Sequence, residues 1–236
     1  MFRTILWYIL LPVLLILFIP KMITLHYLKG KMDDKDFNKL VEEYAANWTS
    51  PLIKSSGIKL DLKGAENIPE GAVLFVSNHQ SNIDVLLFLH FIRKPKGYIS
   101  KSELEKIPLL RTWMKHLQCV FMNRSDIKHS LKAILAGIEI LKSGHSMVVF
   151  PEGTRSKSNE MGDFKPGSFK LATKSLVPIV PVTISGSYKA LEANKNKIKP
   201  THVTMTIHPP IHVKDLSKED LATLPTDVKA IIQSAL

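Results

Sequence analysis

"AVLFVSNHQSNIDVLLFLHF", residues Ala72–Phe91, decides the fold because its hydrophobic pattern changes in the middle. The first part, Ala72–Ser77, is a short apolar run, which is typical of a strand buried on both faces. The last part is apolar again and predicts a helix that ends near Phe91. Between them, His79 and Asp84 stand five positions apart. Loops that follow buried strands hold ligands in such sheets, so this turn is the first candidate site.

The same alternation of strand and helix continues through the rest of the chain. Asp126–Gly144 predicts a helix with Ser125 as its N-cap and Gly144 as its end. Thr201–Ile207 alternates apolar and polar residues, as an edge strand does. We therefore expect an α/β layered domain with a mostly buried mixed sheet flanked by helices. The other predicted strands are Gly97–Ser100, Cys119–Asn123, Ser146–Pro151 and Val177–Gly186.

An uncharged apolar segment, Ile5–Pro20, lies between Arg3 and Lys21. As a helix it would be about 24 Å long, shorter than the ~30 Å hydrocarbon core of a bilayer, and Pro12 would kink it. A secretory signal peptide is the alternative, but no small-x-small cleavage site follows. We therefore expect a retained membrane segment, which either spans the bilayer or lies in one leaflet. If it spans, the lysines that follow it place the rest of the chain on the cytoplasmic side.

The next segment, Met32–Gly57, predicts an amphipathic helix with acidic residues in its first turn, where the helix dipole favours them. Its apolar face packs either against the protein core or against a membrane. Together with the preceding segment, we expect it to form a membrane-associated helical hairpin over residues 1–56, ahead of a globular domain over residues 57–236. The apolar positions, which recur at three- and four-residue steps, are Phe37, Leu40, Val41, Tyr44, Ala45 and Trp48.

The chain has 32 Lys and Arg against 21 Asp and Glu, which gives a formal net charge of +11. This excess favours anionic partners such as nucleic acid, an acidic membrane surface or a phosphorylated substrate. The basic residues are dispersed and no aromatic-basic motif for single strands is present, so the sequence argues against nucleic acid. The single cysteine, Cys119, excludes an internal disulfide, and its apolar setting favours a packed core thiol over a nucleophile.

The turn between the first strand and its helix has two interpretations. Ser81 and Asp84 match a capping box, in which the acid bonds back to the start of the helix. This explains Asp84 but not His79, which leaves the strand within reach of the same carboxylate. A carboxylate that accepts the imidazole N–H leaves the other ring nitrogen free to act as a base. A metal site is disfavoured, because no second histidine or cysteine stands nearby at ligand spacing.

Cationic side chains follow three of the predicted strands. In "FPEGTRS", Phe150–Ser156, Gly153 permits a tight turn with outward backbone donors, and Arg155 adds a planar guanidinium suited to phosphate. An ordinary β-turn with solvated charges is the alternative. Lys101 and Arg124 end two other strands, so the three cations would together form an anion pocket. No Walker-type phosphate loop and no G-x-S-x-G nucleophile motif is present.

In this order the motifs resemble those of the glycerolipid acyltransferases, most closely the bacterial 1-acylglycerol-3-phosphate acyltransferases. "NHQSNID" is similar to the first family block, H-x-x-x-x-D, "FPEGTRS" to the third and "VPIVPVTISG" to the fourth. The second block is G-x-x-F-x-x-R, which Phe121 and Arg124 fit, whereas Gln118 stands in place of the glycine. The resemblance covers roughly Gly57–Val213.

The resemblance implies transfer of a fatty acyl group from a thioester to the sn-2 hydroxyl of 1-acyl-glycerol 3-phosphate, which forms phosphatidic acid in phospholipid biosynthesis. His79 and Asp84 would be the catalytic pair, acyl-CoA or acyl carrier protein would be the donor substrate, and no metal or bound cofactor is expected. A lysophospholipid acceptor suits a membrane location, and the lysines after the apolar segment place the active site on the cytoplasmic side. The implied acceptor site comprises Lys101, Arg124, Glu152, Gly153, Thr154 and Arg155.

Two other functions stay open on the motifs alone. The first is acyl transfer to another acceptor, either glycerol 3-phosphate or a different lysophospholipid. The second is a non-enzymatic basic module that binds a membrane or nucleic acid. A comparison of acceptors separates the first from the main hypothesis, and salt-dependent binding of nucleic acid without acyl transfer would favour the second.

Overall fold

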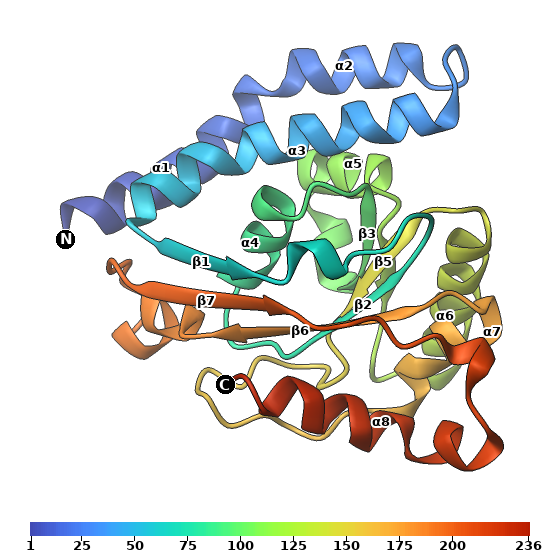
Figure 1. Ribbon diagram of the computed structural model, residues 1–236. Helices are drawn as coiled ribbons and strands as arrows, with labels where there is room; N and C mark the ends of the chain where they lie inside the picture. Colours follow the sequence, from blue (N-terminus) through green and yellow to red (C-terminus); the bar gives the residue numbers. More distant parts are fainter.

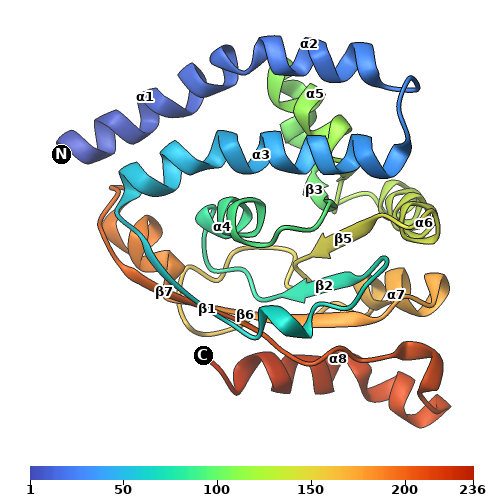
Figure 2. The ribbon, with the colours of Figure 1, turned by 45° about the horizontal axis from the view of Figure 1, so that its top comes forward.

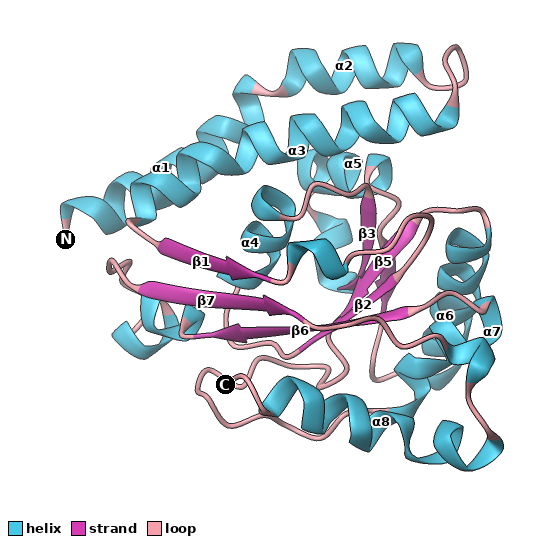
Figure 3. Ribbon diagram, viewed as in Figure 1, coloured by secondary structure: helices cyan, strands magenta, loops and turns pink.

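A mixed sheet runs through the middle of the molecule, as the sequence predicts, and it has seven strands (Figures 1 and 3). Six of them match predicted strands, whereas the strand over Lys59–Lys63 was not predicted. The computed structural model describes residues 1–236. The strands are β1 (Lys59–Lys63), β2 (Leu74–Ser77), β3 (Lys96–Lys101), β4 (Val120–Met122), β5 (Ser146–Val149), β6 (Ile179–Ser185) and β7 (His202–Ile207). Their order in space is β1-β7-β6-β2-β5-β3-β4. The five strands from β6 to β4 are parallel, whereas β7 is antiparallel to β6 and parallel to β1.

Helices cover both faces of this sheet, which makes the three-layered α/β fold that the sequence predicts (Figure 2). The helices are α1 (Phe2–Leu17), α2 (Ile19–Leu28), α3 (Asp34–Ser56), α4 (Ile83–Phe91), α5 (Pro108–His116), α6 (Ile127–Lys142), α7 (Lys170–Ser175) and α8 (Lys218–Gln233). The helices α1–α5 pack on one face of the sheet and α6–α8 on the other.

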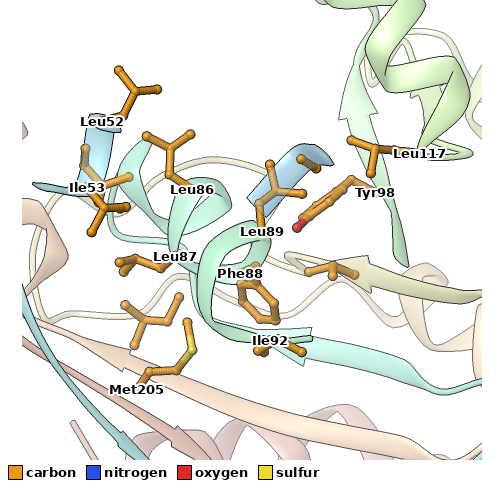
Figure 4. Close-up of a cluster of buried hydrophobic side chains, with 14 of the residues drawn as sticks. Leu52, Ile53, Leu86, Leu87, Phe88, Leu89, Ile92, Tyr98, Leu117 and Met205 are labelled. Atoms are coloured by element: carbon orange, nitrogen blue, oxygen red, sulfur yellow. The ribbon is translucent and has the colours of Figure 1, made fainter. Parts of the chain in front are cut away.

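The central strands are apolar throughout because both of their faces are covered. Successive side chains of β2 point to opposite faces, so Phe75 joins one hydrophobic cluster while Leu74 and Val76 join the other. The first cluster centres on α4, whose side chains contact α3 and the sheet (Figure 4). Full burial of an aliphatic side chain contributes roughly 1.5–3 kcal/mol, so the two clusters hold α4 and the strand ends in fixed positions.

The prediction that Thr201–Ile207 forms an edge strand is wrong. This segment is β7, and it pairs with β6 on one side and with β1 on the other. Its residues alternate between buried and partly exposed. Alternation of apolar and polar residues shows that one face of a strand is less covered than the other. It does not show whether the strand has a hydrogen-bonded neighbour on each side.

The helix predicted over Asp126–Gly144 is α6, but its N-cap is not Ser125. The Asp126 carboxylate accepts a hydrogen bond of 3.0 Å from the His129 N–H, and Asp126 is therefore the cap. The Ser125 hydroxyl instead donates to the Asn123 side chain. The predicted stop is correct, since Gly144 follows the C-cap with a φ of +92°.

The N-terminal helices form the predicted hairpin, in which α3 runs back alongside α1 and α2 (Figures 1 and 2). Helix α1 continues through Pro12, and the break between α1 and α2 falls at Phe18. The Trp7 indole N–H donates to the Leu52 carbonyl at 3.2 Å, which ties α1 to α3. The apolar face of α3 packs into the protein core, which decides between its two interpretations. Because hairpin and sheet share that core, the division between residues 56 and 57 stays a prediction.

The outer face of α1 and α2 is apolar and exposed. Phe2–Leu28 is a helical segment of 27 residues, and its most apolar window of 18 residues has a mean hydropathy of 2.3 and is 17% buried. By length and composition alone this segment is able to cross a membrane. The exposed side chains are Phe2, Ile5, Leu6, Tyr8, Ile9, Val13, Ile16, Leu17, Ile23 and Tyr27.

Gln118 occupies the position at which the second family block has glycine. The backbone conformation at this position explains why glycine is favoured there. The φ of Gln118 is +57°, a left-handed conformation at the end of α5 that costs a non-glycine residue roughly 1 kcal/mol. The side chain offsets this cost by linking two parts of the molecule. Its amide donates to Asn38 on α3 at 3.1 Å and lies 3.3 Å from Nδ1 of His145, before β5. The substitution thus adds a polar link between the hairpin and the sheet.

His145 is the basis of a prediction about pH and stability. Burial lowers the pKa of its imidazole from 6.5 to about 4. As pH falls through 6.5 the unfolded chain takes up a proton that the folded protein refuses, so stability falls with pH. Between pH 7.5 and pH 5, wild-type protein should lose about 2 kcal/mol more unfolding free energy than His145→Gln. Urea unfolding in detergent at both pH values measures this difference.

The control is His202→Gln, because His202 is exposed on β7. That variant should keep the wild-type dependence of stability on pH. Equal losses in wild type and His145→Gln would mean that His145 does not titrate as its burial requires.

Candidate active site

The loops after β2, β5 and β6 meet at one end of the sheet, because these strands are parallel neighbours. The loop after β2, residues 78–82, is fixed to β6 through two buried side chains. Asn78 exchanges two hydrogen bonds of 2.8 Å with the backbone of Ile184. Gln80 accepts a hydrogen bond of 2.9 Å from the Gly186 N–H. Asn78 and Gln80 are each 1% exposed, so this loop has a single well-defined conformation.

His79 lies within this loop, and its ring is held on two sides. Nδ1 lies 2.8 Å from Asp84 Oδ2, and the ring stacks on Phe150 with 4.1 Å between centroids. The side chain is 16% exposed, so it is reachable from solvent or from a ligand. The hydrogen-bond geometry assigns the ring hydrogen to Nδ1, since the carboxylate only accepts, and Nε2 is then a free acceptor. His79 therefore has the geometry of a general base.

Asp84 is fully buried and accepts all of its hydrogen bonds on one oxygen. Besides the His79 ring, Oδ2 accepts from the backbone N–H groups of Gln80 and Ser81 at 2.8 Å each. The bond from Ser81 is half of the predicted capping box. The reciprocal half is missing, because the Ser81 hydroxyl oxygen accepts from the Ile83 N–H at 3.1 Å and not from the Asp84 N–H. The hydroxyl hydrogen is donated to Glu192. Asp84 thus shapes the start of α4 and also orients His79. It is both a helix-capping residue and the partner of the imidazole, as the two interpretations of the sequence had it.

The sequence predicts Glu152 in the acceptor site, whereas in the structure its carboxylate bonds to the loop that carries His79. One oxygen accepts from the His79 N–H at 2.7 Å and the other from the Gly162 N–H at 2.8 Å. The residue is 6% exposed, and burial raises the pKa of this carboxyl. Glu152 does not line the cavity that contains the His79 ring. Its contacts make it a support for the His79 backbone, and its part in substrate binding stays a prediction.

The other predicted site residues do line that cavity together with His79: Lys101, Arg124, Gly153, Thr154 and Arg155. Gly153 has a φ of +75° and its N–H donates to Phe150, so the turn itself uses this donor. Thr154 is exposed and its N–H has no partner within the protein.

The three cations differ in how freely they could meet an anion. Lys101 is exposed and lies 2.7 Å from Glu103. Arg155 forms an ion pair of 2.8 Å with Glu192. Arg124 makes no ion pair, and partial desolvation lowers the pKa of its guanidinium, although Glu103 opposes this. The guanidinium stays charged at neutral pH, so Arg124 is the cation least compensated by the protein.

The cavity has a volume of about 630 Å³, and its lining combines polar with apolar residues. The polar lining residues include His79 and the three cations. The rest is walled by helices of the hairpin and of the core, including α1, which therefore contributes to the site. The apolar lining residues are Leu11, Leu15, Ala45, Trp48, Val85, Leu86, Leu89, Tyr98, Ile99, Leu104, Leu110, Trp113, Met114, Leu117, Cys119 and Phe150.

Sequence reasoning missed two kinds of residue at this site. Asn78 and Gln80 carried a usable signal, because polar residues directly after a buried strand must find partners. Glu192 carried none: it lies 110 residues beyond Asn82, in a short 3₁₀ turn outside every motif. Only the pairing of β2 with β6 brings its loop to the site.

Comparison with known proteins adds the family. The family model described as Acyltransferase matches residues 59–185, more than half of the chain. The crystal structure of the 1-acyl-sn-glycerophosphate (LPA) acyltransferase PlsC from Thermotoga maritima matches with a TM-score of 0.86 and 29% sequence identity, over 99% of this chain and 93% of that one. The chain belongs to the 1-acyl-sn-glycerol-3-phosphate acyltransferase family. The family and the α/β fold predicted from the sequence are both confirmed.

Two relatives of this acyltransferase illustrate the range of coverage. The 1-acyl-sn-glycerol-3-phosphate acyltransferase of Borreliella burgdorferi is 32% identical over 176 residues, which are 73% of this chain and 70% of that protein. "Probable 1-acyl-sn-glycerol-3-phosphate acyltransferase" of Mycoplasma pneumoniae is 38% identical over 143 residues, 59% of this chain. The alignment with the Mycoplasma protein spans 54% of its length.

Asp84→Asn tests whether the acyltransferase needs the charge of this carboxylate. The Asn oxygen can replace Oδ2 and its amide can replace Oδ1, which has no partner, so the loop should keep its shape. Turnover should fall about 100-fold or more, because the neutral amide no longer stabilises a protonated His79. Steady-state kinetics and a thermal melt measure the two effects.

Asp227→Asn is the control, since Asp227 bonds only to Thr223 on the exposed side of α8. Its turnover should stay at the wild-type level. Near-normal turnover of Asp84→Asn would leave Asp84 with the structural role alone.

Proposed function

We propose that this protein transfers a fatty acyl group from an acyl thioester to the sn-2 hydroxyl of 1-acyl-glycerol 3-phosphate, which forms phosphatidic acid in phospholipid biosynthesis. The observation that carries the proposal is the position of the His79 ring, which lines the cavity while the buried Asp84 carboxylate holds its Nδ1 at 2.8 Å. The same cavity is lined by three cations and 16 apolar residues. A substrate that fits this arrangement has a phosphate, a hydroxyl group and long hydrocarbon chains.

His79 would supply the proton transfers. An alcohol is a weak nucleophile at neutral pH, so Nε2 takes its proton as the oxygen attacks the thioester carbonyl. Asp84 stabilises the imidazolium that results. The tetrahedral intermediate then collapses, the carbon–sulfur bond breaks, and the imidazolium returns the proton to the thiolate. The histidine ends neutral, as it began, so it needs no external acid or base.

A covalent acyl-enzyme on cysteine has no support in the site. Cys119 lines the apolar part of the cavity, and burial raises the pKa of its thiol to about 12. A thiol with such a pKa stays protonated at neutral pH and is a poor nucleophile. Direct transfer from donor to acceptor is therefore the simpler mechanism.

The cationic part of the cavity would bind the acceptor phosphate. Arg124 and Arg155 present guanidinium groups that match phosphate oxygens, and the exposed Lys101 adds a third positive charge. The free N–H of Thr154 is a further donor. With the phosphate held there, a hydroxyl on the adjacent glycerol carbons lies toward His79.

The hairpin would hold this site at a membrane. Its outer face exposes ten large apolar side chains of α1 and α2, while Leu11 and Leu15 of α1 line the cavity. The net charge of +11 adds attraction to anionic lipid, of the order of 1 kcal/mol for each Lys or Arg near the surface. We infer a membrane location with the active site on the cytoplasmic side, because Lys21, Lys29 and Lys31 follow the apolar segment.

His79→Ala tests the reaction and its acceptor together. Purified protein in detergent is assayed with 1-acyl-glycerol 3-phosphate, glycerol 3-phosphate and lysophosphatidylcholine, each with acyl-CoA and with acyl carrier protein as donor. We expect wild-type transfer mainly to 1-acyl-glycerol 3-phosphate, and a loss of about 10²–10⁴-fold in His79→Ala.

His212→Ala, at an exposed position away from the cavity, serves as the control and should keep full activity. Preferred transfer to glycerol 3-phosphate or lysophosphatidylcholine would overturn the acceptor assignment. Normal turnover of His79→Ala would remove the histidine from the mechanism.

Arg124→Gln tests the phosphate site. Loss of a charge-assisted hydrogen bond should raise the acceptor KM about tenfold or more and leave the thioester KM within about twofold. Arg111→Gln, on the exposed side of α5, is the matched control and should change neither constant. A rise in the thioester KM with an unchanged acceptor KM would assign Arg124 to the donor instead.

A further inference from the structure

Glu192 connects the three loops that form the site, although it lies outside all of the motifs. It sits in a 3₁₀ turn after β6, and its side chain is 3% exposed. One carboxylate oxygen accepts from Arg155 Nη1 at 2.8 Å and from the Asn82 N–H at 3.0 Å. The other accepts from the Ser81 hydroxyl. A single buried carboxylate thus links the loop after β6 to the loops after β2 and β5.

A buried carboxylate beside a phosphate site is unfavourable unless it has a specific task. Glu192 cancels much of the positive charge of Arg155, which weakens long-range attraction for a phosphate. What it provides is orientation. Arg155 has five N–H donors in a rigid planar group, and the contact with Glu192 uses Nη1. Arg155 lines the cavity together with His79, and its other N–H donors make no hydrogen bond within the protein.

The second set of contacts relates this orientation to the catalytic base. Ser81 and Asn82 directly follow His79 and Gln80 in the loop that Asp84 also holds. Because Glu192 bonds to Ser81, Asn82 and Arg155 together, the guanidinium cannot move relative to the His79 loop without breaking charge-assisted hydrogen bonds. Such bonds are roughly twice as strong as neutral ones.

We propose that Glu192 is a positioning residue that fixes the Arg155 guanidinium relative to the His79 loop, and thereby sets the binding of the acceptor phosphate. The inference rests on the proposed function, since it requires a phosphorylated acceptor in the cationic part of the cavity. Glu192 touches neither the imidazole nor the reacting atoms. Its loss should therefore act on acceptor binding more than on the chemical step.

The test is a double-mutant cycle on the full chain in detergent, with 1-acyl-glycerol 3-phosphate as acceptor and acyl-CoA as donor. Glu192→Gln should raise the acceptor KM about tenfold, with kcat and the thioester KM changed by less than about threefold. Arg155→Gln should raise the acceptor KM at least as much. If Glu192 acts through Arg155, adding Glu192→Gln to Arg155→Gln should cause no further rise.

The matched control is Glu139→Gln, which removes an exposed Glu–Lys pair of 3.0 Å on α6 and should leave all constants unchanged. A thermal melt checks that each variant is folded. If Glu192→Gln does not fold, Glu192→Asp carries the same expectation, because it keeps the charge but cannot reach Arg155 and Asn82 together.

Three results would overturn the inference: an unchanged acceptor KM in Glu192→Gln, additive rises in the double variant, or equal losses of kcat and of affinity for both substrates. Failure of the proposed function gives a different result. In that case the wild-type protein itself transfers no acyl group to 1-acyl-glycerol 3-phosphate.

Discussion

Asp84 accepts three hydrogen bonds on one buried oxygen, and the geometry of the site depends on this atom. Two of the bonds come from backbone N–H groups, so they set the path of the chain between β2 and α4. The third comes from the His79 ring, so the same atom sets the orientation of the imidazole. Since loop shape and ring orientation share one acceptor, the base cannot be displaced without unfolding the start of α4. This is the preorganisation that a proton-transfer catalyst requires.

The surroundings extend the same arrangement. Residues on both sides of His79 bond to buried partners: Asn78 bonds to the backbone of Ile184, and Asn82 bonds to Glu192. The N–H of His79 itself donates to Glu152. These partners lie far away in sequence and are brought together by the order of the parallel strands β6, β2 and β5. The sheet thus acts as the frame, and the loops at its carboxyl end hold the chemistry.

Those features that depend on local pattern could be predicted from the sequence. The apolar runs of β2, β5 and β6 identified buried strands, and the spacing of His79 and Asp84 identified the pair. Local pattern could not assign features that depend on strand neighbours. The alternation of Thr201–Ile207 reported a half-covered face and was mistaken for an edge. Ser125 and Asp126 are both good N-caps, so residue preference could not choose between them. Glu152 and Glu192 are ordinary acidic residues in sequence, and only tertiary contacts give them their partners.

Helix α1 is apolar on all sides, with Phe2, Ile9 and Ile16 exposed on one side and Leu11 and Leu15 on the cavity on the other. A single helix, about 10 Å across, therefore separates the interior of the enzyme from its surroundings. With lipid against the outer side, a fatty chain would pass from one hydrocarbon phase into another and need not be exposed to water. The rate at which acyl chains enter and leave the cavity would then depend on the fluidity and composition of the adjoining leaflet. The bilayer would therefore affect the kinetics of this enzyme.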